Sequence, residues 1–253
     1  MADLPPGGQT KPINGVEVYY ESYGEGEPLL LLHGFMGSGA DWAQVFKRPP
    51  EGYRSIFVDL RGHGRSTNPD GTFTFRQSAR DVLALVDGLG IGQCKAIGVS
   101  GGAQTLLHMA TQQPGRISAM VLVSGGHYFP KEARTFMRKF SLETLPPAEQ
   151  HAMQTRHKHG DAQIQMLLKQ AKGFESSYDD MSFTPPHLAT ITARTLIVFG
   201  DRDPLYPIQV PVEMHTSIPQ SHLWIVPNGG HGPIFGDLRD RFVETALSFF
   251  RGW

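Results

Sequence analysis

The sequence predicts an α/β fold in which a mostly parallel central sheet carries helices on both of its faces. Short apolar runs recur along the 253 residues, and segments with apolar residues at helical spacing separate them. Strands that alternate with helices are joined by right-handed crossovers, which make the sheet parallel and cover both faces. Because binding sites in such sheets lie at the carboxyl ends of the strands, we expect the site in the loops that follow them.

The first half of the predicted sheet begins at residues 16–23, where apolar and polar side chains alternate as in an early edge strand. Continuous apolar runs at 28–32 and 55–59 predict two buried strands. Apolar residues at helical spacing from Phe75 to Val86 then predict a helix that ends near Gly88.

Further apolar runs predict four strands in the second half of the chain, at 94–99, 117–123, 194–200 and 222–226. Helical segments lie between these strands, among them residues 101–113. An apolar stripe from Leu238 to Phe250 predicts a final helix.

The interval 128–186 interrupts this alternation. It contains no apolar strand and shows several short helical patterns, which Pro146, Gly160 and Gly173 separate. We therefore expect residues 1–127 and 187–253 to form an α/β core and residues 128–186 to form a small inserted helical cap that roofs the site.

The composition narrows the function classes. A chain of 253 residues that is 40% hydrophobic suits one sizeable domain with an insertion. The formal net charge is −1 and the 23 Lys and Arg residues are scattered, so neither nucleic acid nor an anionic membrane is an expected partner. No apolar run approaches the length of a membrane span, which predicts a cytoplasmic protein. The single cysteine, Cys94, excludes an internal disulfide and is expected in the core.

The pentapeptide GVSGG at residues 98–102 places Ser100 between a predicted strand and a predicted helix. A strand that turns so sharply into a helix crowds its neighbours, and the flanking glycines relieve this crowding because they lack a Cβ. Such a turn exposes the serine hydroxyl, so Ser100 is the candidate nucleophile. For the pentapeptide taken alone, a glycine-rich turn that happens to contain a serine is the competing interpretation.

A serine hydroxyl needs a base that accepts its proton and an acid that orients the base. His231 is the candidate base, because it follows the strand at 222–226 in a loop with glycines on either side. Two carboxylates, Asp201 and Asp203, follow the strand at 194–200, and the residue pattern leaves both open as the acid.

The negative charge that develops on a reacting carbonyl oxygen requires backbone N–H groups directed at one point. One candidate donor is the N–H of Gly101, directly after Ser100 at a helix N-terminus. The second donor is expected in the loop at 33–37, which follows the strand at 28–32.

At this point the chain resembles the α/β-hydrolase superfamily, in a serine carboxylesterase-like branch with a helical cap. The chain order Ser100, Asp203, His231 matches the family's order of nucleophile, acid and histidine. HGF at 33–35 matches the family's oxyanion loop, and DLRGHGRS at 59–66 matches its epoxide hydrolase, dehalogenase and small esterase branch.

The resemblance also implies roles for individual residues. The family's acid occupies the last position of a GxxD pattern, which favours Asp203 over Asp201. The second oxyanion donor corresponds to the N–H of Phe35. Dehalogenases and epoxide hydrolases of this branch attack with aspartate, so a serine at position 100 argues against both reactions. The reaction that remains expected is acyl transfer. We expect a small-molecule ester with a small to medium acyl chain, and an acyl-enzyme intermediate.

No cofactor and no metal are expected. Metal binding by three cap histidines, His151, His157 and His159, is an alternative, but their spacing matches no ordinary ligand pair on one helical face. The oligomeric state stays open.

Aromatic and methionine side chains near strand ends or in the cap are candidates for the substrate pocket, namely Trp42, Tyr128, Met137 and Phe140. Packing between cap and sheet explains them equally well. Many relatives carry a bulkier residue at the position of Gly101, so the shape of the acyl pocket is not transferred from them.

Lactone hydrolysis, hydrolysis of C–C bonds in dienoic ring-cleavage products and cofactor-free perhydrolysis use the same triad, and all three stay open. A C–C hydrolase needs cationic or polar groups for a second carboxylate. The cap offers Lys131, Arg134, Arg138 and Lys139, which also suit a solvated helix face. A function of a different class is a ligand receptor on a hydrolase fold with slow turnover.

Overall fold

In the computed structural model, which describes residues 8–253 apart from the side chain of Thr144, eight strands form a single sheet in the order β1-β2-β4-β3-β5-β6-β7-β8. Only β2 runs antiparallel to its neighbours, and the other pairs are parallel. The mostly parallel sheet predicted from the sequence is therefore confirmed. The strands are β1 (Gln9–Ile13), β2 (Val16–Tyr23), β3 (Glu27–Leu32), β4 (Tyr53–Val58), β5 (Cys94–Val99), β6 (Ile117–Val123), β7 (Arg194–Gly200) and β8 (Ser221–Val226).

The prediction that residues 16–23 form an edge strand is wrong, because β1 pairs with β2 and takes the edge of the sheet. The sequence of β1, QTKPI, has few residues that favour strands, and Pro12 lacks the N–H of a ladder donor, which an edge strand tolerates. Asn14 and Gly15 connect β1 to β2 with φ angles of +47° and +81°. This Asn-Gly pair is the hairpin signal that identifies β1.

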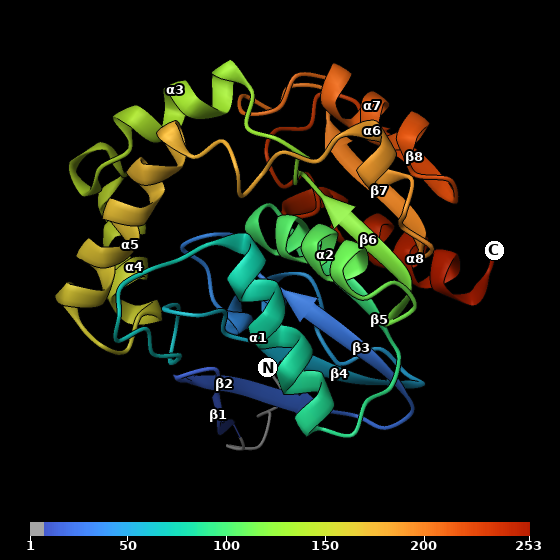
Figure 1. Cartoon of the computed structure of the whole chain (residues 1–253), viewed down its shortest axis with the longest axis horizontal. Coiled ribbons are helices and arrows are strands. Elements are labelled where there is room, and N and C mark those ends of the chain that lie inside the picture. The colour runs from blue at the N-terminus through green and yellow to red at the C-terminus, as the bar shows by residue number, and fades with distance from the viewer. Residues whose placement is uncertain (1–7) are drawn as a thin grey trace.

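Helices cover both faces of the sheet, as Figure 1 shows. Successive residues of β3 point to opposite faces: Leu30 and Leu32 pack with α1 and α2, whereas Leu29 and Leu31 pack with α8. Cys94 is buried, as predicted. The core helices are α1 (Phe75–Gly88), α2 (Gly101–Gln112), α7 (Gln209–Ser217) and α8 (Arg239–Arg251), with short 3-10 turns η1 (Gly39–Gln44) and η4 (Gly236–Leu238).

The segment between β6 and β7 is helical. In Figure 1 its helices α3 to α5 form an arch on the side to which the arrowheads of β3 and β6 point. Its elements are α3 (Lys131–Lys139), η2 (Leu142–Thr144), α4 (Pro147–Arg156), α5 (Asp161–Gly173), η3 (Phe174–Ser176) and α6 (Pro185–Leu188). We call residues 128–186 the inserted segment. The core was expected to begin at residue 1, but residues 1–7 lie outside the described part of the chain.

Within the described residues, none of the helices has the length and apolar character needed to cross a lipid bilayer.

Candidate active site

Ser100 occupies a strained turn between β5 and α2. Its φ angle is +50°, a conformation that non-glycine residues rarely adopt. Its N–H donates to the carbonyl of Val123 at the end of the neighbouring strand, at 2.7 Å. A Cβ on Gly98 would lie 2.5 Å from the carbonyl carbon of Gly102, and a Cβ on Gly102 would lie 2.2 Å from the carbonyl oxygen of Leu32. Gly98 therefore lets β5 approach the first turn of α2, and Gly102 lets that turn pack against β3.

The structure brings Ser100, His231 and Asp203 into one hydrogen-bonded chain. The Ser100 hydroxyl donates to Nε2 of His231 at 3.0 Å, and Nδ1 of His231 donates to Oδ2 of Asp203 at 2.9 Å. The Asp203 side chain is fully buried, and its other oxygen accepts the backbone N–H groups of Leu205 and Tyr206. Asp201, the other carboxylate left open by the residue pattern, is exposed.

Three further side chains support this chain of hydrogen bonds. The hydroxyl of Ser124, buried at the end of β6, accepts the N–H of Gly232 at 3.0 Å and so fixes the loop of His231. The Tyr206 ring stacks on the His231 ring with centroids 6.1 Å apart, and its hydroxyl accepts from Gln104 at 2.9 Å. Sequence reasoning missed all three. The position of Ser124, directly after a strand at the same edge of the sheet, was the available signal.

The backbone of the loop at 33–37 lies close to Ser100 and to the start of α2. A Cβ on Gly101 would be 2.9 Å from the backbone nitrogen of Phe35. The Gly34 carbonyl accepts from Nδ1 of His33 at 2.7 Å and from the N–H of Gly37 at 2.9 Å. Since this carbonyl and the Phe35 N–H belong to one trans peptide, holding the carbonyl directs the N–H the opposite way.

The tautomer of His33 follows from its contacts. Leu60 donates its N–H to Nε2 of His33 at 3.0 Å, so Nε2 is unprotonated and Nδ1 carries the proton given to Gly34. Burial lowers the pKa of His33, which keeps the ring neutral. The neutral His33 ring therefore holds the loop through the carbonyl of Gly34.

A cavity of about 400 Å³ opens above Ser100. Its walls are mostly apolar, and core and inserted segment both contribute to them. Of the four predicted pocket residues, Trp42, Met137 and Phe140 line the cavity, whereas Tyr128 does not. The backbone of Tyr128 instead pairs with Ser182, and its ring contacts His127. Other lining side chains include Phe75, Phe129, Phe136, Leu145, Met153, Phe174, Leu205, Tyr206 and Phe235.

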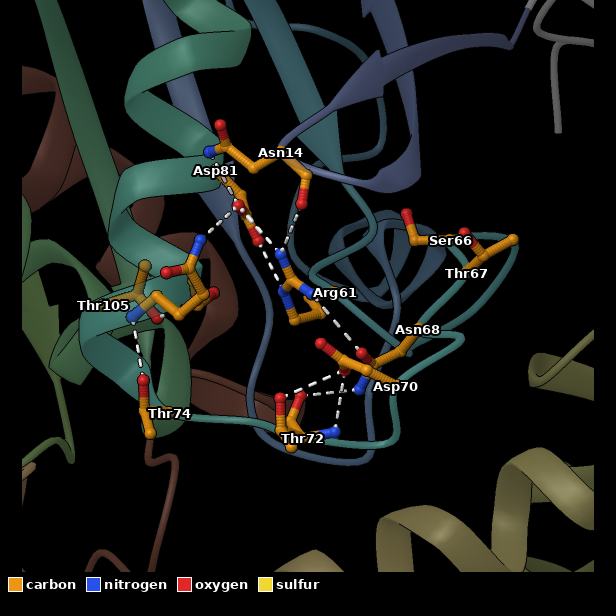
Figure 2. Close-up of polar contacts among 12 residues, drawn as sticks. Asn14, Arg61, Ser66, Thr67, Asn68, Asp70, Thr72, Thr74, Asp81 and Thr105 are labelled. Carbon is orange, nitrogen blue, oxygen red and sulfur yellow. Dashed lines mark hydrogen bonds and ion pairs between the residues drawn. The ribbon is translucent and has the colours of Figure 1, made fainter.

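The DLRGHGRS stretch contributes structure rather than a cavity wall. Figure 2 shows the guanidinium of Arg61 directed at Asp81, with further contacts to Asn14 and Asn68. The Arg61–Asp81 pair is buried, with an Nε–Oδ2 distance of 2.7 Å and a second bond at 3.2 Å. Such a two-point pair fixes the loop rigidly against α1.

His151, His157 and His159 of the inserted segment do not form a cluster. His157 is buried, with Nδ1 accepting from Gly64 and Nε2 donating to the Met36 carbonyl, while His159 contacts the Arg65 carbonyl. Within residues 8–253, no three His, Cys, Asp or Glu side chains lie close enough together to hold a metal ion.

Comparisons with known proteins agree with this architecture. The family model described as the alpha/beta hydrolase fold matches residues 27–147. The serine hydrolase BPHL of Mus musculus is 29% identical, over 93% of this chain and 84% of its own length. The 2-hydroxy-6-oxo-6-phenylhexa-2,4-dienoate hydrolase of Comamonas testosteroni is 25% identical, over 95% of this chain and 93% of its own length.

The fold is also shared with solved structures. A meta-cleavage product hydrolase from Pseudomonas fluorescens IP01 has a TM-score of 0.82 at 19% sequence identity, with 97% of this chain and 98% of that chain covered. The strand order, the family-model match over residues 27–147 and the solved structures together show that the chain has the α/β-hydrolase fold, and its similarity to serine hydrolases supports a place in that superfamily.

Proposed function

We propose that the chain hydrolyses carboxylic esters with Ser100 as the nucleophile. The observation that carries this proposal is the Ser100 hydroxyl, hydrogen-bonded to His231 at 3.0 Å on the wall of an apolar cavity. His231 accepts the serine proton as the hydroxyl oxygen attacks the ester carbonyl, and Asp203 holds the ring in the tautomer that can accept it. The C–O bond of the ester then breaks, and His231 returns the proton to the leaving alcohol.

Deacylation follows the same route with water. His231 takes a proton from the water molecule, the resulting hydroxide attacks the acyl-enzyme, and Ser100 leaves with the proton that His231 returns. The N–H groups of Phe35 and Gly101 hold the oxyanion in both steps. Each such donor is worth roughly 3 kcal/mol of the activation barrier.

The inserted segment acts as a cap over this site. Its side chains Phe136, Phe140 and Met153 form part of the cavity wall opposite the core. The cavity volume of about 400 Å³ limits the acyl chain to small or medium length, and burial of each methylene against the apolar wall stabilises the complex by about 0.8 kcal/mol.

The charges of the cavity favour an ester without a second carboxylate. Among its lining residues, which all belong to the described chain, Arg156 is the only Arg or Lys, and Asp41 and Glu149 already pair with it. Arg134 and Arg138 are engaged elsewhere, with backbone carbonyls and with Glu175. A dienoate would therefore find no unpaired cation among these residues, which disfavours C–C hydrolysis.

A panel of substrates tests the proposal. Purified wild type and Ser100→Ala are compared on p-nitrophenyl esters of two to twelve carbons, on lactones and on a dienoate ring-cleavage product. We expect ester turnover that is highest at short to medium chains, and a loss of at least about 1000-fold in kcat for Ser100→Ala with an unchanged circular dichroism spectrum.

Other outcomes would redirect the proposal. Faster turnover of lactones or of the dienoate would assign the triad to those reactions. Tight ligand binding without turnover above the uncatalysed rate would indicate a receptor. Full activity of Ser100→Ala would refute the nucleophile itself.

A further inference from the structure

The oxyanion loop contains a second strained residue, Met36, directly after Phe35. Its φ angle is +66°, in the left-handed region that a bulky unbranched side chain rarely adopts. Such a conformation costs on the order of 1–3 kcal/mol and persists only where the surroundings hold it. The contacts that hold Met36 therefore also hold the preceding peptide, which carries the Phe35 N–H.

Two side chains of the inserted segment bind the Met36 carbonyl. The Arg156 guanidinium donates to it at 3.1 Å, and Nε2 of His157 donates to it at 3.2 Å. Both residues lie at the carboxyl end of α4, 120 residues along the chain from Met36. His157 is buried, and because its Nδ1 accepts the N–H of Gly64 at 3.1 Å, the ring is the neutral tautomer that carries its proton on Nε2.

The Met36 side chain is held by the same segment. Met36 is buried in a small apolar cluster whose other buried members, Met153, Ile164, Leu167 and Leu168, all come from α4 and α5. Both the carbonyl and the side chain of the strained residue thus contact the inserted segment.

We propose that Arg156 and His157 are positioning residues of the oxyanion hole, which they complete by holding Met36 in its left-handed conformation. They do not touch the reacting atoms in this scheme. They act through the Met36 carbonyl and keep the Phe35 N–H directed at the oxyanion. This inference rests on the proposed function for its catalytic consequence, although its structural part can be tested without any substrate.

The neighbouring attachments of the inserted segment provide a control. Gln163 on α5 donates its amide to the carbonyls of Gly62 and Gly64, at 2.9 and 3.2 Å. It fastens the same segment to the core without touching Met36. Loss of Gln163 should therefore weaken the attachment and leave the oxyanion loop in place.

Two substitutions of His157 test its two hydrogen bonds one at a time. In His157→Asn the shorter amide can replace Nδ1 toward Gly64 but does not reach Met36. In His157→Gln the longer amide can replace Nε2 toward Met36. We expect His157→Asn to lower kcat about tenfold with KM within twofold, since the oxyanion hole acts mainly in the transition state. His157→Gln and Gln163→Met should keep kcat within about threefold.

A readout independent of turnover is amide hydrogen exchange at Gly37, whose N–H donates to the Gly34 carbonyl in the same loop. We expect exchange to be at least about tenfold faster in His157→Asn and unchanged in Gln163→Met. If His157→Asn does not fold, Arg156→Gln, at a side chain that is 17% exposed, replaces it, with Gln163→Met again as the control.

The two proposals fail in different ways. Normal Gly37 exchange in His157→Asn, or equal kcat losses in His157→Asn and Gln163→Met, would overturn the positioning role. Absence of Ser100-dependent hydrolysis in the wild type would overturn the proposed function, and the exchange measurement would still decide whether the inserted segment holds the loop.

Discussion

The Phe35 backbone can lie close to Gly101, beside Ser100, because Gly101 has no Cβ. The Cβ of any other residue would lie 2.9 Å from the backbone nitrogen of Phe35 and 3.1 Å from the ring of Phe75. The first contact is with backbone, which cannot rotate away. A bulkier residue here therefore requires the loop at 33–37 to lie farther from α2.

Gly101→Ala should consequently impair turnover more than stability. The new methyl group pushes the Phe35 N–H away from the oxyanion, and we expect kcat to fall at least about tenfold. Gly173→Ala is the control, because no atom lies within 4 Å of its Cβ position and its φ angle of −60° suits alanine. Steady-state kinetics and urea unfolding of both variants check this, and wild-type kcat in Gly101→Ala would contradict it.

At the level of single residues, the sequence could predict which three side chains meet but not which residues support them. Ser100, Asp203 and His231 each follow a strand end, and the chain order limits the choices. Ser124 also follows a strand end, but its role and that of Tyr206 depend on which loops the sheet brings together. Tyr128 is the converse case, since its position after a strand suggested the cavity while its ring packs against His127 instead.

Among the elements, α1 begins at a cap supplied from a distant part of the chain. The carboxylate of Asp180, in the inserted segment, accepts the N–H groups of Phe75 and Arg76 at 2.7 and 3.1 Å. These are the first two residues of the helix, whose N–H groups have no partner within it. Negative charge at this end also complements the helix dipole.

Asp180→Ala should therefore destabilise the fold by about 2 kcal/mol, because it leaves a buried N–H group without an acceptor. Asp179→Ala is the matched control, since this exposed neighbour accepts hydrogen bonds from Arg76 and Ser182 through its backbone carbonyl, which alanine keeps. Urea unfolding followed by circular dichroism measures both. Equal midpoints for wild type and Asp180→Ala would refute the capping role.

The buried strands were predictable to within a residue or two because they are continuous apolar runs, and 94–99, 117–123 and 194–200 match the structure at both ends. The edge strand β1 was not, since its sequence is mostly polar and its strand conformation depends on the pairing with β2. The inserted helices were predictable in kind but not in placement. Their amphipathic patterns indicate that one side of each helix is buried. The patterns do not indicate which part of the core covers that side.

Across the whole molecule, neutral histidines join the inserted segment to the core. His157 links α4 to the loops at 33–37 and 61–66, and His108 on α2 donates to the Asp180 carbonyl at 2.8 Å. Burial lowers the pKa of each ring to about 4. Folding therefore requires both rings to be unprotonated at a pH where the unfolded chain would protonate them.

The free energy of unfolding should accordingly fall as the pH drops below about 6.5, the pKa of histidine in an unfolded chain. Between about pH 6.5 and 4 the unfolded state binds more protons than the folded state, so acid favours unfolding, by about 1 kcal/mol per ring at pH 5.5. Buried Asp59 and Asp180 have raised pKa values, which act in the opposite direction, so the test is a difference between variants. In urea unfolding at pH 7.5 and 5.5, His108→Gln should lose less stability on acidification than the wild type, and an equal or larger loss would contradict the prediction.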